Sequence, residues 1–372
     1  NISTVANLPN PNLKWEQTAQ TNIGWDLGFF DGRLNIGGDF YYKKTTDLFT
    51  NVDVSPINGI TSYIMNNGDM LNKGFSISLN GYPVKTKNFR WYMSTYYSVN
   101  LNKVQTDDAR NYNLNDYLNG TAVVSGQPIS TFYSYKFLGL NPQNGAPMFD
   151  DWEDRWHLLQ GKTLDEVVPM ILVNSGTRDP KFSGDLNNTF TYKNWSLSLN
   201  FSYSLGSKVR LFEMYGPIIN GISAAANVRE EFLDRWQVPG DEKYTVYPSI
   251  ISPSSPDYEH YRLHYSAPQR AVGPNSGVPA FANNVWQMYD DSDLRVVSGN
   301  YLKLQSLSFS YRLNDRLLRK TPFTQLSISF NTHNCFTISA KELRGQDPSQ
   351  AGFADAGLSI RPSYTIGLNV SF

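Results

Sequence analysis

The sequence predicts an all-β fold, a transmembrane antiparallel β-barrel with about eleven strands among its 372 residues. Three observations predict this class. Polar and apolar residues alternate along many segments, the composition is rich in aromatic residues and poor in charge, and short connections alternate with long ones. All three are typical of barrel strands, which have one face toward lipid and the other toward a polar interior.

The alternation is clearest at 195–203, W-S-L-S-L-N-F-S-Y. A strand with this period of two has one apolar and one polar face. We expect Ser198, Asn200 and Ser202 to face the lumen of the barrel. The residues expected to face lipid are Leu197, Leu199, Phe201 and Tyr203. The same alternation recurs at 34–42, 75–80, 90–101 and 363–372.

The composition agrees with a barrel. Aromatic residues make up 14% of the chain, with 23 Tyr, and charged residues only 17%. The mean hydropathy is -0.42, and no run of about 18 apolar residues is present to form a transmembrane helix. A barrel accommodates this polarity because half of each strand and all of the loops face water. The balance of 33 acidic to 32 basic residues excludes the basic footprint of a nucleic-acid-binding protein.

The connections between the expected strands give the chain a direction. The expected strands are 17–29, 33–46, 73–82, 88–103, 128–139, 146–151, 184–192, 195–208, 300–312, 324–334 and 362–372. Tight turns such as 30–32 and 193–194 alternate with long segments such as 47–72 and 209–299. In outer-membrane barrels the short turns are periplasmic and the long loops extracellular. We therefore expect the long loops outside the cell and the C-terminus in the periplasm.

The strand count predicts that the barrel extends beyond this sequence. Eleven is odd, whereas bacterial barrels have even strand counts, and the chain begins without Met or a signal peptide. We expect at least one ascending strand ahead of Asn1, so that residues 1–372 are the C-terminal part of a larger barrel. Outer-membrane barrels generally end on an aromatic residue that the insertion machinery reads. Phe372 is the expected barrel assembly signal.

Six segments carry a resemblance to a known family. They are N-P-N-L-K-W-E-Q-T-A-Q-T-N-I-G-W-D-L-G-F at 10–29, Y-Y-K-K-T-T-D-L-F at 41–49, N-G-D-M-L-N-K-G-F at 67–75, T-F-Y-S-Y-K-F-L-G-L-N-P at 131–142, F-L-D-R-W-Q-V-P-G-D at 232–241 and G-N-Y-L-K-L-Q-S-L-S-F-S-Y at 299–311. In this order, and over essentially the whole chain, they resemble the corresponding segments of SusC-like TonB-dependent transporters.

The resemblance implies a 22-stranded barrel in the outer membrane of a Gram-negative bacterium of the Bacteroidetes type. The chain would form its second half, with the plug and the TonB-box outside this sequence. The resemblance also implies energised import through the TonB complex, a SusD-like surface lipoprotein as partner, and often a dimer of transporter and lipoprotein pairs. The implied cargo is an oligomeric nutrient, an oligosaccharide or a peptide. No covalent chemistry and no cofactor are implied.

The loops contain aromatic candidates for contact with cargo or partner. Trp152 and Trp156 are four residues apart and could form one face of a short helix. Packing within the loop is the alternative to stacking on a ligand. The tract that follows Asp241 is rich in Pro, Ser and Tyr. Its candidate contact residues are Tyr258, Tyr261 and Tyr265.

Two clusters raise the question of a metal site. The acidic residues Asp150, Asp151, Glu153 and Asp154 could offer oxygen ligands to Ca²⁺, but they lack the Gly-bearing loop of an EF-hand. A solvated acidic loop is the alternative. The pair His260 and His264 has helical i,i+4 spacing without the glutamate of H-E-x-x-H. These clusters are candidates only, and no metal is predicted.

The largest connection, 209–299, is expected to be one extracellular loop region with a short helix at 227–236. In N-V-R-E-E-F-L-D-R-W, Asn227 is the expected cap, with Glu230 three residues on. Val228, Phe232 and Leu233 supply an apolar stripe on this helix. A structural brace for the loop is the expected role.

The sequence contains no enzyme motif, so no catalytic residue is predicted. It has no G-x-S-x-G, P-loop or G-x-G-x-x-G unit, and the single Cys335 excludes an internal disulfide. Two other functions stay open: a passive porin, which would share the strands and turns, and a surface carbohydrate-binding β-protein. An upstream plug would distinguish the transporter from a porin. Detergent-dependent solubility would distinguish either barrel from the binding protein.

Overall fold

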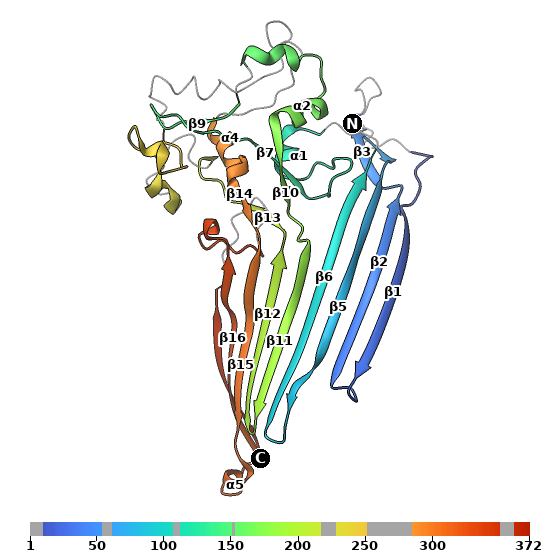
Figure 1. The fold of residues 1–372 in the computed structure, drawn as a ribbon, viewed down its shortest axis with the longest axis vertical. Coiled ribbons are helices and arrows are strands. Elements are labelled where there is room, and N and C mark those ends of the chain that lie inside the picture. Colours follow the sequence, from blue (N-terminus) through green and yellow to red (C-terminus); the bar gives the residue numbers. More distant parts are fainter. Residues whose placement is uncertain are drawn as a thin grey trace, which may run out of the picture.

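The computed structural model describes residues 10–53, 62–106, 112–150, 153–216, 228–250, 285–349 and 361–372. Nine antiparallel strands form one sheet in which every strand pairs with its neighbours in sequence order (Figure 1). They are β1 (Gln17–Phe29), β2 (Leu34–Thr46), β5 (Asp69–Lys85), β6 (Phe89–Gln105), β11 (Phe182–Tyr192), β12 (Trp195–Leu205), β15 (Tyr301–Arg312), β16 (Gln325–Ser339) and β17 (Ser363–Ser371). This up-and-down order is that of a barrel wall, with β1 and β17 as its two edges.

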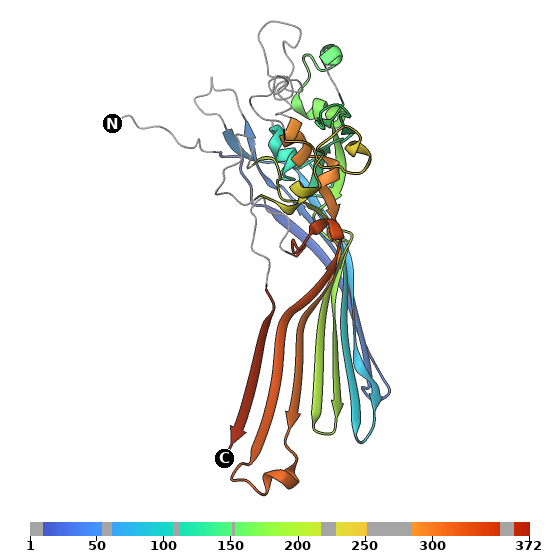
Figure 2. The same ribbon diagram turned by 90° about the vertical axis from the view of Figure 1, so that its left-hand side faces the viewer.

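The sheet is a tall curved wall with different connections at its two ends (Figure 2). One end, the turn end, carries the tight connections and the C-terminus, and the other, the loop end, carries the long connections (Figure 1). At the turn end, Phe30, Asp31 and Gly32 have φ of 55°, 52° and 77°, the left-handed backbone that short hairpin turns require. The predicted alternation of short and long connections is confirmed.

The register places like residues on like faces. Leu197 of β12 pairs with Phe190 of β11 and Phe309 of β15, and the next residue, Ser198, pairs with Ser308. One row of paired apolar residues crosses six strands through Ile23, Phe40, Phe75, Val99, Phe182 and Leu205. The adjacent polar row is Asp39, Ser76, Ser98, Ser183 and Ser204. The wall therefore has one continuous apolar face and one continuous polar face, as the alternation predicts.

The prediction of about eleven barrel strands is wrong in number, because the main sheet of the described residues contains nine. The segments expected as strands 128–139 and 146–151 lie in the loops. There, β7 (Thr131–Tyr135) pairs with β10 (Leu172–Thr177), and the two-residue strands β8 (Gly139–Leu140) and β9 (Pro147–Met148) pair with each other. All five residues of β7 are buried, so it lacks the two-faced pattern of a barrel strand.

Short elements fill the loop end. The described ones are β3 (Phe49–Asp53), β4 (Ser62–Asn66), α1 (Leu114–Leu118), η2 (Glu153–Leu158), α2 (Leu164–Ile171), β13 (Lys208–Arg210), η4 (Glu230–Asp234), η5 (Asp241–Lys243), α4 (Val285–Asp290), η6 (Asp293–Arg295), β14 (Val296–Ser298) and η7 (Lys341–Leu343). The single helix of the turn end is α5 (Asp315–Leu318). We call the described residues within 112–177 and 208–298 the loop unit.

Candidate functional site

The loop unit has a hydrophobic core of its own. Two connections that are far apart in sequence bring their apolar side chains into one cluster, which includes Tyr135, Phe149, Val167, Phe232 and Trp286. Tyr215 is a buried member of this cluster, and its ring centroid lies 5.1 Å from that of Phe232 and 5.5 Å from that of Tyr289 in edge-on contacts. Many aromatic residues of the loops are thus packed against one another and not displayed to a ligand.

A buried carboxylate closes this core. Asp290, the last residue of α4, accepts hydrogen bonds from three consecutive backbone N–H groups, those of Met214, Tyr215 and Gly216, at 2.9, 2.8 and 2.9 Å. Tyr215 in turn donates its hydroxyl to the carbonyl of Pro248 at 2.6 Å. These bonds join segments about 75 residues apart in sequence and hold the chain after β13 in a fixed path.

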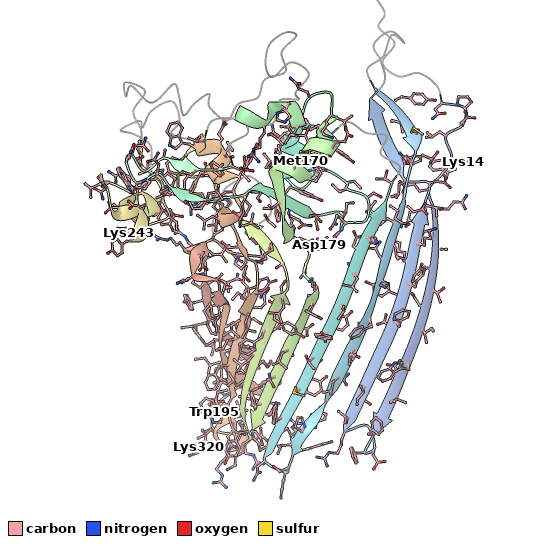
Figure 3. All side chains as sticks on the ribbon, turned by 45° about the horizontal axis from the view of Figure 1, so that its top comes forward. Lys14, Met170, Asp179, Trp195, Lys243 and Lys320 are labelled. Carbon is pink, nitrogen blue, oxygen red and sulfur yellow. The ribbon has the colours of Figure 1, made fainter. Side chains whose placement is uncertain are left out.

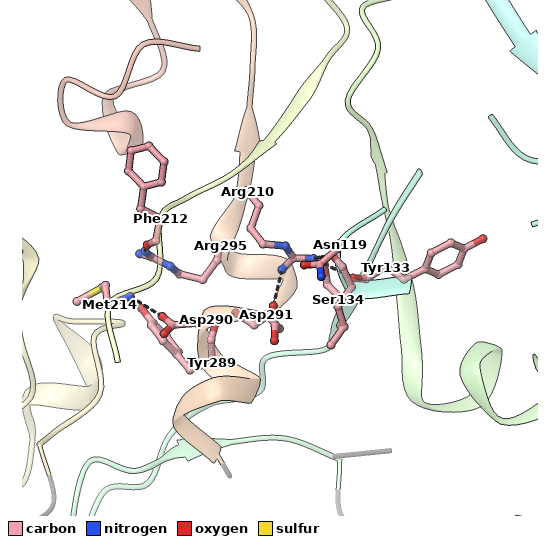
Figure 4. Close-up of polar contacts among 12 residues, drawn as sticks. Asn119, Tyr133, Ser134, Arg210, Phe212, Met214, Tyr289, Asp290, Asp291 and Arg295 are labelled. Atoms are coloured by element: carbon pink, nitrogen blue, oxygen red, sulfur yellow. Dashed lines mark hydrogen bonds and ion pairs between the residues drawn. The ribbon is translucent and has the colours of Figure 1, made fainter. Parts of the chain in front are cut away.

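Two arginines, Arg210 and Arg295, lie close to the adjacent carboxylates Asp290 and Asp291, which we call the acidic pair (Figure 4). Arg295 is buried, donates to the carbonyl of Phe212 at 2.5 Å and lies over the Tyr289 ring. Arg210 donates to the carbonyls of Leu118 and Tyr133 at 3.1 and 2.9 Å. Its second terminal nitrogen lies 3.9 Å from the carboxylate of Asp291. The charged groups hold the two loops together, and their hydrogen bonds to main-chain carbonyls offset part of the cost of burial.

Burial governs the titration of the acidic pair. Loss of water raises the pKa of Asp290 to about 6, although Arg295 and the three N–H donors act in the opposite direction. Burial likewise raises the pKa of Asp291 to about 6 against the influence of Arg210. Both carboxyls therefore keep their protons to a higher pH than ordinary surface carboxyls do.

The most exposed apolar surface of the loop unit lies on η4 and η5. Leu233 is 73% exposed and Tyr244 is 90% exposed, and Val238 and Val246 are exposed beside them. We call these four residues the η4–η5 face. A cavity of about 510 Å³ opens here, and Leu233 and Tyr244 are among its lining residues. An exposed apolar surface with a polar rim is typical of an interaction site.

One ion pair and one cation–π contact support this face from the loop after β16. Arg344, which follows η7, lies 2.8 Å from the carboxylate of Asp234 and over the ring of Tyr247. Asp241 accepts hydrogen bonds from the backbone N–H groups of Gln237 and Val238 at 2.9 and 3.0 Å. The turn that presents Tyr244 is thereby fixed from within.

The polar face of the wall is lined by hydrogen-bonded amides and hydroxyls. Tyr41 donates to Asn100 at 2.7 Å, and Asn102 donates to Asn72 at 2.7 Å. Further along the wall Ser308 donates to Asn331 at 2.6 Å. These side chains can form hydrogen bonds with water or a polar solute in many orientations.

Several predicted contact residues lie outside the described residues. These are Trp152, Asp151, Tyr258, Tyr261 and Tyr265, together with the histidines His260 and His264. Trp156, Glu153 and Asp154 belong to the 3-10 helix η2, and a shared helix face for Trp152 and Trp156 stays a prediction. Asp150 is described, and its carboxylate pairs with Arg155 at 2.5 Å. In the described part of the chain no three His, Cys, Asp or Glu side chains are grouped as metal ligands would be.

The expected helix at 227–236 is wrong in type and extent. The structure has a 3-10 helix at Glu230–Asp234. Arg229 occupies its N-cap position, but the Arg229 side chain makes no capping hydrogen bond. The expected cap, Asn227, lies outside the described residues. Phe232 and Trp236 are buried, whereas Leu233 and Val228 are exposed. Burial of the two aromatic rings in separate contacts replaces the single stripe of a continuous helix.

Lipid contact by residues of the wall and the assembly role of Phe372 stay predictions. Leu197, Leu199, Phe201 and Tyr203 all pair along the apolar face, in the register expected for lipid contact. Phe372 lies at the turn end, 84% exposed, with its ring 5.2 Å from that of Phe323. Its position leaves the terminal aromatic accessible.

The sequence pattern does not indicate the buried charges Asp290 and Arg295, or the partly buried Arg210. The signal was weak, because Asp290 and Asp291 simply follow an apolar helix in V-W-Q-M-Y-D-D. Their partners lie some 75 residues earlier, and only the folded loops bring them together. Tyr244 was missed for the same reason, since exposure depends on tertiary packing.

Comparison with known proteins gives a consistent result. The chain matches the family model described as TonB dependent receptor-like, beta-barrel, over residues 1–229. It is similar to TonB-dependent receptor P3 of Formosa agariphila, with 25% identity over 397 residues that cover 99% of this chain and 35% of that protein. It is also similar to TonB-dependent receptor SusC of Bacteroides thetaiotaomicron, with 30% identity over 224 residues, 57% of this chain and 21% of that protein.

The fold has a relative among solved structures. The structure of the RagAB peptide transporter superposes with a TM-score of 0.69 at 20% identity, covering 99% of this chain and 37% of the solved one. The chain thus spans about a third of the length of the relatives that it matches from end to end. None of the described helices has the length and apolar character to cross a bilayer. The matches confirm the resemblance carried by the six sequence segments.

Proposed function

We propose that this chain, which belongs to the TonB-dependent receptor-like β-barrel family, is the C-terminal part of an outer-membrane importer of the SusC-like type. The nine strands would form part of a 22-stranded barrel, with the loop end extracellular and the turn end periplasmic. The plug and the TonB-box would lie in the rest of the protein. Energy would come from the TonB complex, and no covalent chemistry is proposed.

The observation that best supports this proposal is that the nine-stranded wall has a continuous polar face on one side and a continuous apolar face on the other. An apolar outer surface suits lipid, and an inner surface of amides and hydroxyls suits a water-filled passage for a polar solute. The chain aligns over almost its whole length with about a third of each of two relatives, which supports its being part of a larger protein. The solved relative is described as a peptide transporter, so peptide and oligosaccharide are both proposed cargo classes.

The proposed partner is a SusD-like surface lipoprotein that covers the loop end, with a dimer of such pairs as the assembly. The η4–η5 face is the surface that we assign to this contact. Its exposed Leu233 and Tyr244 are the kind of apolar and aromatic anchors that carry binding energy in protein interfaces. The internal support of this face by Arg344 and Asp241 favours this assignment, because a surface that is already rigid loses less entropy on binding.

Purification of the full-length protein from outer membranes in detergent tests this proposal. We expect a surface lipoprotein to co-elute, and mass spectrometry of the same sample to identify bound oligosaccharide or peptide. Leu233→Ser with Tyr244→Ser should lower lipoprotein recovery at least several-fold. Leu317→Ser, at an exposed apolar residue of the turn end, is the matched control and should leave it unchanged. A protein that elutes alone, or that is soluble without detergent, would contradict the proposal.

A further inference from the structure

Charge is distributed very unevenly between the turn end and the rest of the chain. The closed ends of the four hairpins, residues 29–34, 84–90, 192–195 and 312–325, contain nine Lys or Arg and two Asp. The remaining residues contain 23 basic and 31 acidic side chains. The turn end is therefore strongly basic in a chain of net charge -1. Lys320 on the last turn and Trp195 on β12 both lie at this end (Figure 3).

These basic side chains are not neutralised within the described residues. None of the nine takes part in an ion pair with another described residue. Two of them, Lys85 and Lys193, lie over the rings of Tyr82 and Tyr192 at 5.2 and 5.3 Å. Aromatic rings beside Lys or Arg are characteristic of a membrane interface.

A pocket of about 490 Å³ opens at the same end, next to the first turn. Its lining residues include Leu34, Leu79, Gly81 and Met93, which the register places together on the apolar face: Leu34 and Met93 both pair with Gly81, and Leu79 lies two residues before Gly81. Gly81 is required there, because a Cβ atom would lie 2.3 Å from the carbonyl oxygen of Arg33. Strand β2 thus approaches closely, and Gly81 adds no side chain to the pocket.

One cation lies at this pocket. Arg33 is exposed and lines the pocket together with Phe30, which is 74% exposed. An apolar pocket with a guanidinium at its mouth matches a molecule that has a hydrocarbon chain and a phosphate. Arginine suits phosphate because its planar fork can donate two parallel hydrogen bonds.

We propose that the turn end binds an anionic glycerophospholipid of the periplasmic leaflet, with an acyl chain in the pocket and the headgroup phosphate against Arg33. This rests on the proposed function, since it requires the apolar face to lie in the outer membrane. The Arg33 cation favours a headgroup with net negative charge over a zwitterionic one, in which an ammonium group already neutralises the phosphate. The bound lipid would fix the depth of the barrel at its periplasmic rim.

Lipid titration of the delipidated full-length protein in detergent, followed by native mass spectrometry, tests the assignment. Dioleoyl phosphatidylglycerol should bind at least about fivefold more tightly than dioleoyl phosphatidylcholine, the factor that one cation near an anionic headgroup supplies. Arg33→Gln should remove this preference, whereas Arg33→Lys should keep part of it. Arg319→Gln, on the same rim but outside the pocket lining, should change it by less than twofold.

Substitutions that change the volume of the pocket test whether it holds an acyl chain. Met93→Trp, which fills the space, should weaken both lipids at least about tenfold, and Met93→Leu should not. Equal binding of the two lipids would overturn the proposal. Equal effects of Arg33→Gln and Arg319→Gln would overturn it in favour of a diffuse basic surface. Heat-modifiable migration on gels reports the barrel separately. A heat-modifiable protein without lipid preference defeats only this inference, and a detergent-independent protein without such migration defeats the proposed function.

Discussion

Lys303 of β15 and Asp347 of the loop after β16 form a buried ion pair, with 3.0 Å between Nζ and Oδ2 and side-chain exposures of 4% and 9%. Lys303 pairs with Ser202 on the polar face of the wall, so the contact joins that face to a loop. Burial opposes ionisation of Asp347, but hydrogen bonds from Ser349 and Lys303 prevail and lower its pKa. The loop after β16 is thereby attached to the wall by charge.

Removal of one partner should detach this loop. Asp347→Leu leaves the Lys303 ammonium buried without a counter-charge, which should lower the free energy of unfolding of the loop contact by about 3–5 kcal/mol. Limited proteolysis of the segment after β16 should become faster. The double variant with Lys303→Met is the control and should recover most of the protection, since a well-packed apolar pair often replaces a buried ion pair at little cost. Unchanged proteolysis in Asp347→Leu would count against the contact.

The register of β12 predicts different effects at adjacent residues. Leu199→Arg places a charge on the apolar face and should destabilise the barrel by about 2–4 kcal/mol if it lies near the bilayer midplane. Asn200→Arg places the same charge on the polar face and should cost much less. Unfolding in urea of the protein reconstituted in lipid vesicles measures both. Equal costs would mean that the two faces are assigned incorrectly.

The acidic pair predicts that the loop unit is more stable at mildly acidic pH. Burial raises the pKa of Asp290 and Asp291 to about 6, against about 3.9 in the unfolded chain. Between these values the folded state binds more protons, so the free energy of unfolding falls as pH rises from about 4 through 6. The loss should reach about 3 kcal/mol per carboxyl at most.

Hydrogen exchange at 131–135 and 208–216, corrected for the intrinsic rate, should therefore show greater protection at pH 5 than at pH 7. Asp291→Asn is the control, because it removes one titrating group and should reduce the difference. Greater protection at pH 7 would show that the three N–H donors and Arg295 outweigh the effect of burial.

The terminal aromatic predicts an effect on assembly and not on folded stability. Deletion of Phe372 should lower the heat-modifiable fraction in the outer membrane several-fold, since insertion would lack its terminal signal. Phe372→Tyr keeps an aromatic end and should assemble normally. Full assembly of the truncated protein would remove this role from Phe372.

Much of the wall is predictable from the sequence because strand patterning is local. The period of two in 195–203 is sufficient to predict β12 and its two faces, and the tight turn at 30–32 predicts the first hairpin. Errors arise where tertiary contacts override the pattern. The segment at 131–135 has strand-forming residues, but its partner, β10, lies in the same loop region and both faces are buried.

The loop unit is less predictable because its determining contacts are long-range. Asp290 and Arg210 look like surface charges in sequence, and their burial follows from packing against residues some 75 to 92 positions away. The η4–η5 face is similar, since Phe232 is buried while its neighbour Leu233 is exposed. The pattern of polar and apolar residues in one sequence does not show which of two adjacent apolar residues becomes buried in the core.

Uptake by cells tests the central claim most directly. Cells that carry or lack the full-length protein would be incubated with a mixture of oligosaccharides and peptides, with the TonB complex intact or depleted, and the medium analysed by mass spectrometry. If the protein is an energised importer, at least one component should disappear only when both the protein and the TonB complex are present. Protein-dependent depletion that is unchanged by loss of TonB would contradict it and indicate a passive porin.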